Sequence, residues 1–220
     1  MKILCLYNNK CALELFQWLE EQGHDVFLCK ERLAKSWCEE QNFDLTVSYT
    51  YRYILTEEVI NALHGNVVNI HNSLLPWNRG ADPNLWSIIE ETPRGVTLHY
   101  VDTGLDKGFI IAQELVQDIN DKETLSSTYN NLDRTAKSLF KRAFSVYEFW
   151  PSLKKQCLGK GSYHSLSDGE KIKTLISSYN LSVDEYKARL KITLPQLIAN
   201  SLSLNFFASF IISKKRRYLR

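Results

Sequence analysis

Two side chains suited to a transfer reaction stand two positions apart in this sequence. Asn69 and His71 lie in the stretch VVNIHNSLLPWNRGAD, residues 67–82, directly after an apolar run. An asparagine amide can donate a hydrogen bond to a developing oxyanion, and a histidine exchanges a proton near neutral pH. A carboxylate that orients the histidine or takes up the proton would complete the set, and the sequence offers Asp102 and Asp106 for that role.

The patterns that are missing narrow the chemistry. The chain has no serine or cysteine nucleophile elbow, which disfavours a covalent acyl-enzyme. The turn NNKCAL, which follows the first predicted strand, contains no G-x-G-x-x-G, and a Walker loop is absent as well. The amide, imidazole and carboxylate therefore favour direct transfer, in which an amine of the substrate attacks a carbonyl.

Two other classes of protein stay open on these residues alone. A metal-dependent hydrolase would take His71, His99 and Asp106 as ligands; the sequence has no H-E-x-x-H helix signature, and we expect no metal. A binding module would keep ligand affinity and show no turnover. His99 alternates with Thr97 on one strand face, which favours a supporting place in the core over a reactive one.

The elements that must position these residues alternate along the first part of the chain. Short apolar runs separated by helical patterns predict a parallel sheet with right-handed crossovers. Sites in such sheets form at the carboxyl ends of strands, which is where Asn69 and His71 lie. The strands are predicted at residues 2–7, 25–29, 44–49 and 66–70, with a helix stop at Gly23 and a helix start at Thr56.

The pattern changes after the Asn-x-His stretch. A helix is predicted over residues 83–91, and two strands at 94–102 and 109–116, joined by a loop containing glycine, predict an antiparallel hairpin. A long amphipathic helix is predicted from about residue 123 to 149, where Pro151 ends it. The fold class is therefore α/β, an open Rossmann-like, mostly parallel twisted sheet with an antiparallel hairpin and a small C-terminal appendage.

The 220 residues divide, on these patterns, into a catalytic domain at 1–150 and a C-terminal subdomain at 151–220 that contains two short helices. Apolar residues make up 44% of the chain and charged residues 24%, which is typical of globular proteins. The formal net charge of +2 gives no strongly basic face, so we expect no nucleic-acid partner.

Location follows from the cysteines and the apolar segments. The five cysteines form no C-x-x-C pair, which predicts reduced thiols, mostly in the core, and a cytoplasmic protein. The N-terminus lacks a signal-peptide pattern, and no segment reaches the roughly 18 apolar residues of a membrane span. We expect the C-terminal end, LNFFASFII and the basic residues after it, to be solvated. The alternative is a weak association with a membrane surface.

Two stretches resemble the folate-dependent formyltransferase family. NIHNSLLPWNRG and GVTLHYVDTGLDKGFIIAQ carry the family's Asn-x-His-x-Ser-x-x-Pro and Gly-x-Thr-x-His-x-x-Asp-x-Gly-x-Asp-x-Gly patterns, and the resemblance covers about residues 1–150. Asn72 stands where the family usually has proline. The resemblance implies N-formyl transfer from 10-formyltetrahydrofolate to a primary amine, with Asn69, His71 and Asp106 catalytic and no metal.

The resemblance also implies a folate site built largely from backbone groups. Such groups suit a flat heterocycle whose edge alternates hydrogen-bond donors and acceptors. We expect Asp102 to form a turn as well as to flank the folate. The implied contacts are Tyr53, Ile54 and Leu55 in one loop, and Val101, Asp102 and Thr103 in a second loop beside Asp106.

The acceptor is implied by LPWNRGADPNLW, which is similar to the branch of the family that acts on sugar nucleotides. It is also similar to the formylation domain of some nonribosomal peptide synthetases; the 220 residues contain no adenylation domain, so we expect the free sugar enzyme. Within this branch, the length and the N-terminal sequence resemble an enzyme of the pseudaminic acid pathway. The acceptor implied by that resemblance is a UDP-linked 4-amino-4,6-dideoxy sugar, UDP-4-amino-4,6-dideoxy-L-AltNAc. The implied substrate contacts are Trp77, Asn78, Arg79 and Gly80.

Alternatives remain at this loop and for the acceptor. Arg79 could face the diphosphate or pair with Asp82, and Trp77 could stack on the ligand or cover the loop. His164 is expected in a turn. Other acceptors are initiator methionyl-tRNA, glycinamide ribonucleotide and peptidyl amines, and hydrolysis of formylfolate would use the same triad. Since sugar-modifying relatives are often dimers, the resemblance favours a homodimer.

Overall fold

The computed structural model describes residues 1–116, 123–156 and 159–196. Two compact units share the chain, and each draws on segments that are far apart in the sequence. Of the described residues, the first unit comprises 1–72, 96–114, 133–156 and 159, and the second comprises 73–95, 115–116, 123–132 and 160–196. The domain boundary expected at residue 150 stays a prediction.

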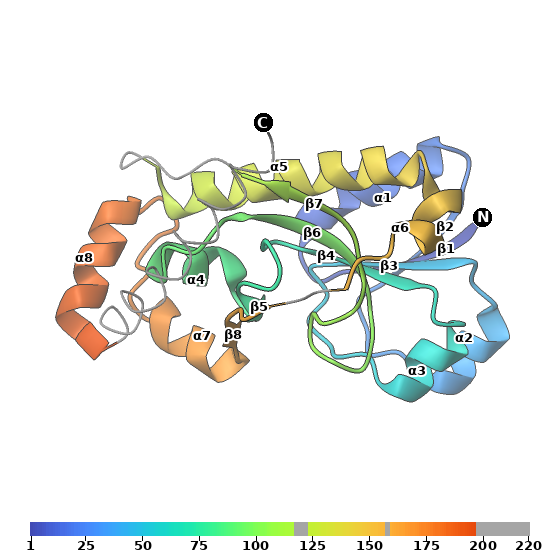
Figure 1. Cartoon of the computed structure of the whole chain (residues 1–220), viewed down its shortest axis with the longest axis horizontal. Helices are drawn as coiled ribbons and strands as arrows, with labels where there is room; N and C mark the ends of the chain where they lie inside the picture. Colours follow the sequence, from blue (N-terminus) through green and yellow to red (C-terminus); the bar gives the residue numbers. More distant parts are fainter. Residues whose placement is uncertain (117–122, 157–158, 197–220) are drawn as a thin grey trace. The chain divides into compact units, whose positions relative to one another are not determined.

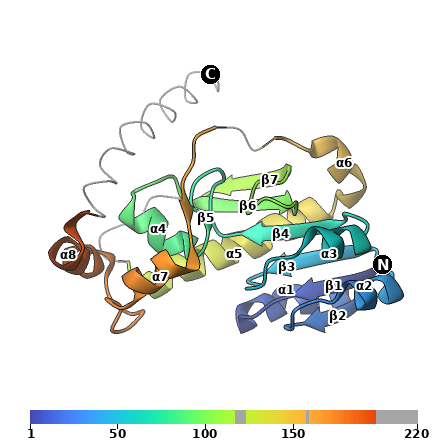
Figure 2. The same ribbon diagram turned by 90° about the horizontal axis from the view of Figure 1, so that it is seen from below.

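A six-stranded sheet carries the candidate site. Its strand order is β2-β1-β3-β4-β6-β7, which can be followed in Figure 2. The first four of these strands pair in parallel, and β4 pairs with β6 in the antiparallel sense. The mostly parallel sheet is therefore confirmed. The strands are β1 Lys2–Leu6, β2 Asp25–Cys29, β3 Leu45–Tyr49, β4 Val67–His71, β6 Gly95–Tyr100 and β7 Ile110–Leu115.

The predicted hairpin is confirmed as the pair β6 and β7. The backbone N–H of Tyr100 donates to the carbonyl of Phe109, and the N–H of Val116 donates to the carbonyl of Arg94. The first bond lies next to the connecting loop and the second at the far ends of the two strands. Such a ladder, in which residue numbers rise along one strand and fall along the other, is that of an antiparallel pair. The hairpin therefore returns the chain to β4 and places the loop 101–109 at one end of the strands.

Helices cover both faces of this sheet. In Figure 1, α1 (Leu13–Glu21) and α5 (Leu125–Phe144) lie on one face, and α2 (Lys35–Gln41) and α3 (Glu57–Ala62) lie on the other. A 3-10 turn at Lys10–Ala12 precedes α1. Burial on both faces explains why the strands read as continuous apolar runs.

The side chains beneath these helices are apolar. Leu4 and Leu6 pack with Leu63 and Cys38 from the α2 and α3 face. Burial raises the pKa of the Cys5 and Cys38 thiols, as expected for cysteines that serve as small core residues.

The ends of the N-terminal helices follow their sequence signals. The hydroxyl of Thr56 accepts a hydrogen bond from the N–H of Val59 and caps α3, as predicted. After α1, Gly23 adopts a φ of +83°, a conformation that glycine takes without strain, and the chain turns there into β2.

The long helix is shorter than the sequence predicts. It ends at Phe144 rather than near residue 149, and a 3-10 turn at Tyr147–Phe149 and the short helix α6 (Trp150–Leu153) follow. The reason is the packing of Trp150, which is fully buried and whose indole N–H donates to the carbonyl of Ala143 at 2.8 Å. Pro151 lies in the first turn of α6, where its missing N–H costs no hydrogen bond.

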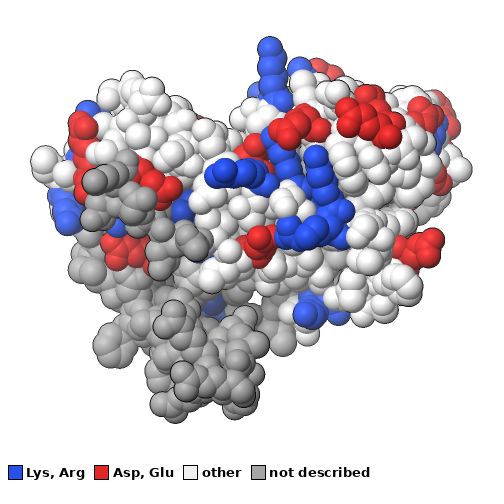
Figure 3. Space-filling view, turned by 90° about the horizontal axis from the view of Figure 1, so that it is seen from above, with Lys and Arg blue, Asp and Glu red and all other residues white. Residues whose placement is uncertain are grey.

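A chain of polar groups links α1, β3 and α5; the Lys137 and Asp133 side chains are largely buried, and the Glu14 side chain is exposed. The Lys137 ammonium lies 2.7 Å from a carboxylate oxygen of both Asp133 and Glu14, and the hydroxyl of Tyr49 donates to Asp133 at 2.7 Å. Burial by itself would lower the pKa of Lys137, and the two carboxylates outweigh it, so the pKa is raised. Figure 3, seen from this side, shows acidic and basic side chains next to one another.

Among its described residues, the second unit contains three whole helices, the start of α5 and a two-stranded sheet. The helices are α4 (Pro83–Ile89), α7 (Leu166–Lys173) and α8 (Val183–Thr193), and the sheet pairs β5 (Arg79–Gly80) with β8 (Tyr163–His164) in parallel. Predicted helices at 83–91 and within the C-terminal segment are thereby confirmed. Apolar side chains form its core, namely Leu85, Trp86, Ile88, Ile89, Leu125, Ile172, Leu181, Val183, Tyr186 and Leu190.

Serine residues begin the two C-terminal helices. Ser165 forms a capping box with Asp168 at the start of α7, and Ser182 caps α8 through the N–H of Glu185. The apolar and basic C-terminal stretch lies outside the described residues. Across those that are described, none of the helices has the length and apolar character to cross a membrane.

Replacing Lys137 should destabilise the first unit. In Lys137→Met, the Asp133 carboxylate stays buried without its cation, and we expect a loss of about 3 kcal/mol in the free energy of unfolding. Urea unfolding followed by tryptophan fluorescence measures it. The control is Lys35→Met, since Lys35 and Glu39 form an i,i+4 pair that is more than half exposed, and its loss should stay within about 0.5 kcal/mol. Equal effects of the two substitutions would contradict the burial argument.

Candidate active site

The strand β4 brings the first two predicted catalytic residues to one face of the sheet. Asn69 and His71 are two positions apart on a strand, so their side chains point to the same side. Asn69 lies directly opposite His99 in the register of β4 and β6, and His71 lies opposite Thr97. The antiparallel pairing therefore sets His99 beside Asn69, a neighbour that the parallel strands could not provide.

Asp106 reaches this group from the loop between β6 and β7. Its Oδ1 lies 3.5 Å from the amide nitrogen of Asn69 and from Nε2 of His99, and its Oδ2 lies 3.7 Å from Nε2 of His71. The structure thus brings Asn69, His71 and Asp106 together, although they come from two elements. Asp106 has a φ of +50°, an uncommon conformation for a residue other than glycine.

The loop that carries Asp106 closes tightly on itself. The N–H of Gly104 donates to the side chain of Asp102 at 2.9 Å, which makes Asp102 the turn-former that the sequence predicts. A Cβ atom on Gly108 would lie 1.8 Å from the carbonyl oxygen of Tyr100. Only glycine allows this approach, so Gly108 lets the loop fold back over the end of β6.

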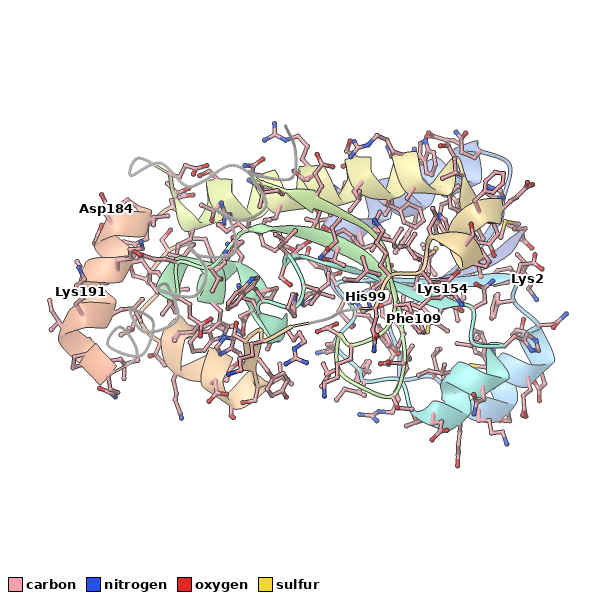
Figure 4. The ribbon with its side chains drawn as sticks, viewed as in Figure 1. Lys2, His99, Phe109, Lys154, Asp184 and Lys191 are labelled. Atoms are coloured by element: carbon pink, nitrogen blue, oxygen red, sulfur yellow. The ribbon has the colours of Figure 1, made fainter. Side chains whose placement is uncertain are left out.

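His99 orients the amide of Asn69. Its Nδ1 lies 2.8 Å from the carbonyl oxygen of Tyr100, which only accepts, so Nδ1 carries a proton. In the neutral ring Nε2 is then an acceptor, and the Asn69 amide nitrogen lies 3.3 Å from it. The tautomer thereby fixes which end of the amide faces Asp106. Figure 4 marks His99 among the side chains of the sheet.

Burial strengthens the charges at this site. His71 is 7% exposed and His99 is 2% exposed, while the Asp106 side chain is 9% exposed. Removal from water strengthens the attraction between the carboxylate and a protonated His71. The distances of 3.5 to 3.7 Å exceed those of tight hydrogen bonds, as is common before a substrate draws catalytic groups together. In the described part of the chain, no three His, Cys, Asp or Glu side chains are grouped to hold a metal ion.

The two loops predicted to hold folate meet one hydrophobic cluster. Leu55 is a buried member of this cluster, and Val101 and Tyr51 pack against it. Residues 53–55 and 101–103 lie outside any helix or strand. The N–H of Val101 donates to the carbonyl of Val67 at 2.8 Å, so that one N–H is not available to a ligand. Loop backbone beside an apolar floor is the donor set that a flat heterocycle needs.

The side chains of the first loop are exposed to different degrees. Ile54 is 67% exposed, whereas the Tyr53 ring packs edge-on against Tyr51 at 5.3 Å and lies beneath two guanidinium groups, those of Arg32 and Arg52. Burial is the main cause that raises the pKa of Tyr51 to about 12. The tyrosine therefore stays protonated, and its hydroxyl donates to the carbonyl of Glu31.

The predicted substrate loop lies in the second unit and uses its side chains unequally. Trp77 is buried, and Asn78 is fully buried: its amide donates to Thr92 at 2.7 Å and its Oδ1 accepts from Ser162 at 3.0 Å. Arg79 differs, because its Nε is buried and has no hydrogen-bond partner among the described residues. Asp82 pairs with Lys173 at 2.8 Å, so the alternative pairing of Asp82 with Arg79 is not the one observed.

His164 is not in a turn, which corrects the prediction from sequence. It lies on β8 with its ring stacked on Trp86 at 3.8 Å and its Nε2 3.1 Å from a carboxylate oxygen of Glu90. All three side chains are buried. The stretch GSYHS was too short to show strand periodicity, and the partners of His164 lie more than seventy residues away in the sequence.

The chain matches the family model "Formyl transferase" over residues 20–144. Among solved structures, it resembles the formyltransferase PseJ from Anoxybacillus kamchatkensis in complex with UDP-4,6-dideoxy-4-formamido-L-AltNAc and tetrahydrofolate, at 36% identity and a TM-score of 0.73. That match covers 86% of this chain and all of the other. A 4-N formyltransferase from Francisella tularensis has the same fold, with a TM-score of 0.65, 23% identity and 78% of each chain covered.

Sequence relatives point to the same family. A methionyl-tRNA formyltransferase of Fusobacterium nucleatum is 38% identical over 104 residues, which cover 47% of this chain and 33% of that protein. The chain spans about a third of the length of such curated relatives. The matched family model extends over more than half of the 220 residues and contains both the Asn-x-His strand and the loop of Asp106. The protein belongs to the formyl transferase family.

Proposed function

We propose that this protein is an N-formyltransferase that moves a formyl group from 10-formyltetrahydrofolate to the primary amine of a UDP-linked 4-amino-4,6-dideoxy sugar. The observation that carries the proposal is the largely buried group of Asn69, His71 and Asp106, with His99 fixing the Asn69 amide. Support for the substrates comes from PseJ, whose complex contains a formylated sugar of this kind and tetrahydrofolate.

Each side chain of the triad has one task in this mechanism. The amine attacks the formyl carbon, and the Asn69 amide and protonated His71 donate hydrogen bonds to the oxyanion that develops. Asp106 stabilises the imidazolium across 3.7 Å and accepts the proton that the amine loses. The bond between the formyl carbon and the folate nitrogen then breaks, and the proton returns to that nitrogen.

The folate loops supply binding and no chemistry. We assign the backbone of Tyr53, Ile54 and Leu55, and of Val101, Asp102 and Thr103, to the edge of the heterocycle. The shared cluster of Leu55 and Val101 gives its apolar face a floor. The reacting carbon of the transfer is that of the formyl group, which the folate donor itself carries.

Arg79 is the residue that we assign to the diphosphate of the acceptor. A guanidinium makes bidentate contacts with phosphate oxygens, and the unpartnered Nε of Arg79 is available for one. Trp77, Asn78 and Gly80 belong to the same loop. The buried Asn78 holds the backbone next to Arg79, since its backbone N–H donates to the Ser162 hydroxyl and its side-chain Oδ1 accepts from the same hydroxyl. A cytoplasmic location and a homodimer stay predictions.

Substitution of the triad should abolish transfer while folding is kept. We expect Asn69→Ala to lower the rate of tetrahydrofolate release about 10²- to 10³-fold, and His71→Ala and Asp106→Asn to lower it at least as much. The assay follows absorbance with 10-formyltetrahydrofolate and a panel of UDP-linked 4-amino sugars, and mass spectrometry detects the formylated product. His64→Ala, which changes an exposed histidine just before the N-terminal end of β4, the end opposite to His71, is the control.

The panel also separates the alternatives. Release without any acceptor would indicate a formylfolate hydrolase. Transfer to methionyl-tRNA, and to none of the sugars, would replace the proposed acceptor, in keeping with the sequence relatives. Full activity of His71→Ala would contradict the mechanism itself.

Arg79 should affect acceptor binding far more than chemistry. Loss of a charge-assisted hydrogen bond is worth about 1.5–3 kcal/mol, so Arg79→Met should raise the KM for the nucleotide sugar about 10- to 100-fold, with little change in kcat or in the KM for the folate. Steady-state kinetics with each substrate varied in turn measures this. Arg189→Met removes a partly exposed ion pair within α8 and hydrogen bonds to Leu175 and Ser177, and it should leave all kinetic constants unchanged. A fall in kcat alone would argue against diphosphate binding.

A further inference from the structure

The strand β8 is bonded directly to the loop that contains Arg79. The N–H of Asn78 donates to the hydroxyl of Ser162 at 2.9 Å, the N–H of Arg79 donates to the carbonyl of Ser162 at 3.0 Å, and the N–H of Ala81 donates to the carbonyl of His164 at 3.0 Å. A segment some eighty residues further along the chain therefore sets the path of the Arg79 loop.

Two glycines allow the two backbones to come this close. A Cβ atom on Gly80, whose φ is +88°, would lie 2.3 Å from the carbonyl oxygen of His164, and one on Gly161 would lie 1.8 Å from the carbonyl oxygen of Pro76. Any other residue would push the strands apart. The pairing of β5 with β8 is thus built into the sequence at both of its strands.

Opposite faces of β8 have opposite character. His164 points inward, where Trp86 stacks on it and Glu90 lies within 3.1 Å. Tyr163 is 51% exposed, and the register pairs it with Arg79. The inward anchor holds the strand, so that Tyr163 has a fixed place opposite Arg79 in the strand register.

The position of the Tyr163 ring relative to Gly80 is also defined. Its Cε2 atom lies 3.0 Å from where a Cβ of Gly80 would be, so the ring occupies the space that a side chain at position 80 would take. The result is a half-exposed aromatic ring on the residue paired with Arg79, whose Nε has no hydrogen-bond partner among the described residues. Aromatic rings in such surroundings offer a face on which nucleotide bases stack.

We propose that Tyr163 is a substrate-binding residue that stacks on the pyrimidine base of the nucleotide-linked acceptor, next to the diphosphate at Arg79. This inference rests on the proposed function and extends it to a residue outside the Asn-Arg-Gly loop. It assigns a role in substrate selection to the C-terminal segment, because β8 belongs to the part of the chain that follows the family match. Tyr163 does not contact the reacting amine in this scheme, so it affects binding and not the chemical step.

The test compares Tyr163→Ala and Tyr163→Phe with Tyr179→Ala in the full chain. Tyr179 is an equally exposed tyrosine of the same unit, at 54%. Calorimetric titration with UDP, and with 10-formyltetrahydrofolate as reference, measures binding. We expect Tyr163→Ala to weaken UDP binding about tenfold, Tyr163→Phe and Tyr179→Ala to bind like the unmodified protein, and folate binding to stay constant in all three. With the sugar nucleotide, KM should rise in Tyr163→Ala while kcat at saturation is kept.

The outcomes separate the two proposals. If the unmodified protein binds UDP and transfers formyl groups to a UDP-sugar, but Tyr163→Ala binds UDP equally well, the stacking role is overturned and the proposed function stands. A Tyr163→Phe variant as weak as Tyr163→Ala would also overturn stacking, since the ring is kept. If the unmodified protein binds no UDP and formylates no UDP-sugar, the acceptor assignment fails, and the role of Tyr163 fails with it. Thermal unfolding of each variant shows whether folding is retained.

Discussion

The register between β4 and β6 is the constraint on which the candidate site depends. Because these strands run antiparallel, Asn69 and His99 face each other directly, and Asp106 comes back to both of them from the end of β6. A shift of the register by one residue would turn Asn69 and His71 to the opposite face of the sheet. The buried apolar residues that alternate with them, Val68 and Ile70, oppose such a shift, so the core of the sheet and the site are fixed by the same pairing.

Two networks of buried and partly buried polar groups join elements that are far apart in the sequence. Asn69, His99 and Asp106 join β4, β6 and the following loop, whereas Tyr49, Asp133 and Lys137 join β3 to α5. A buried polar group without a partner is costly, and these groups bind one another instead. The exception among the proposed binding residues is Nε of Arg79, and a ligand oxygen would satisfy it.

The second unit shows how a short loop acquires a fixed shape without a helix or a long strand of its own. Only Arg79 and Gly80 form β5, and only Tyr163 and His164 form β8. So short a sheet has few hydrogen bonds to stabilise it. The stacking of His164 on Trp86, the contact with Glu90 and the buried amide of Asn78 supply what the ladder lacks.

The sequence by itself determined the alternation of strands and helices, the hairpin and the residue types of the candidate site, because hydrophobic periodicity and short motifs are local signals. It placed Asn69 and His71 at a strand end and chose Asp106 over Asp102 by resemblance. The tertiary structure decided the rest. It ended α5 at Phe144, because Trp150 needs a buried place and a partner for its indole N–H. His164, expected in a turn, lies on a buried strand, and Tyr163 pairs with Arg79 in the register of that strand. These features depend on contacts between segments far apart in the chain, which no local pattern encodes.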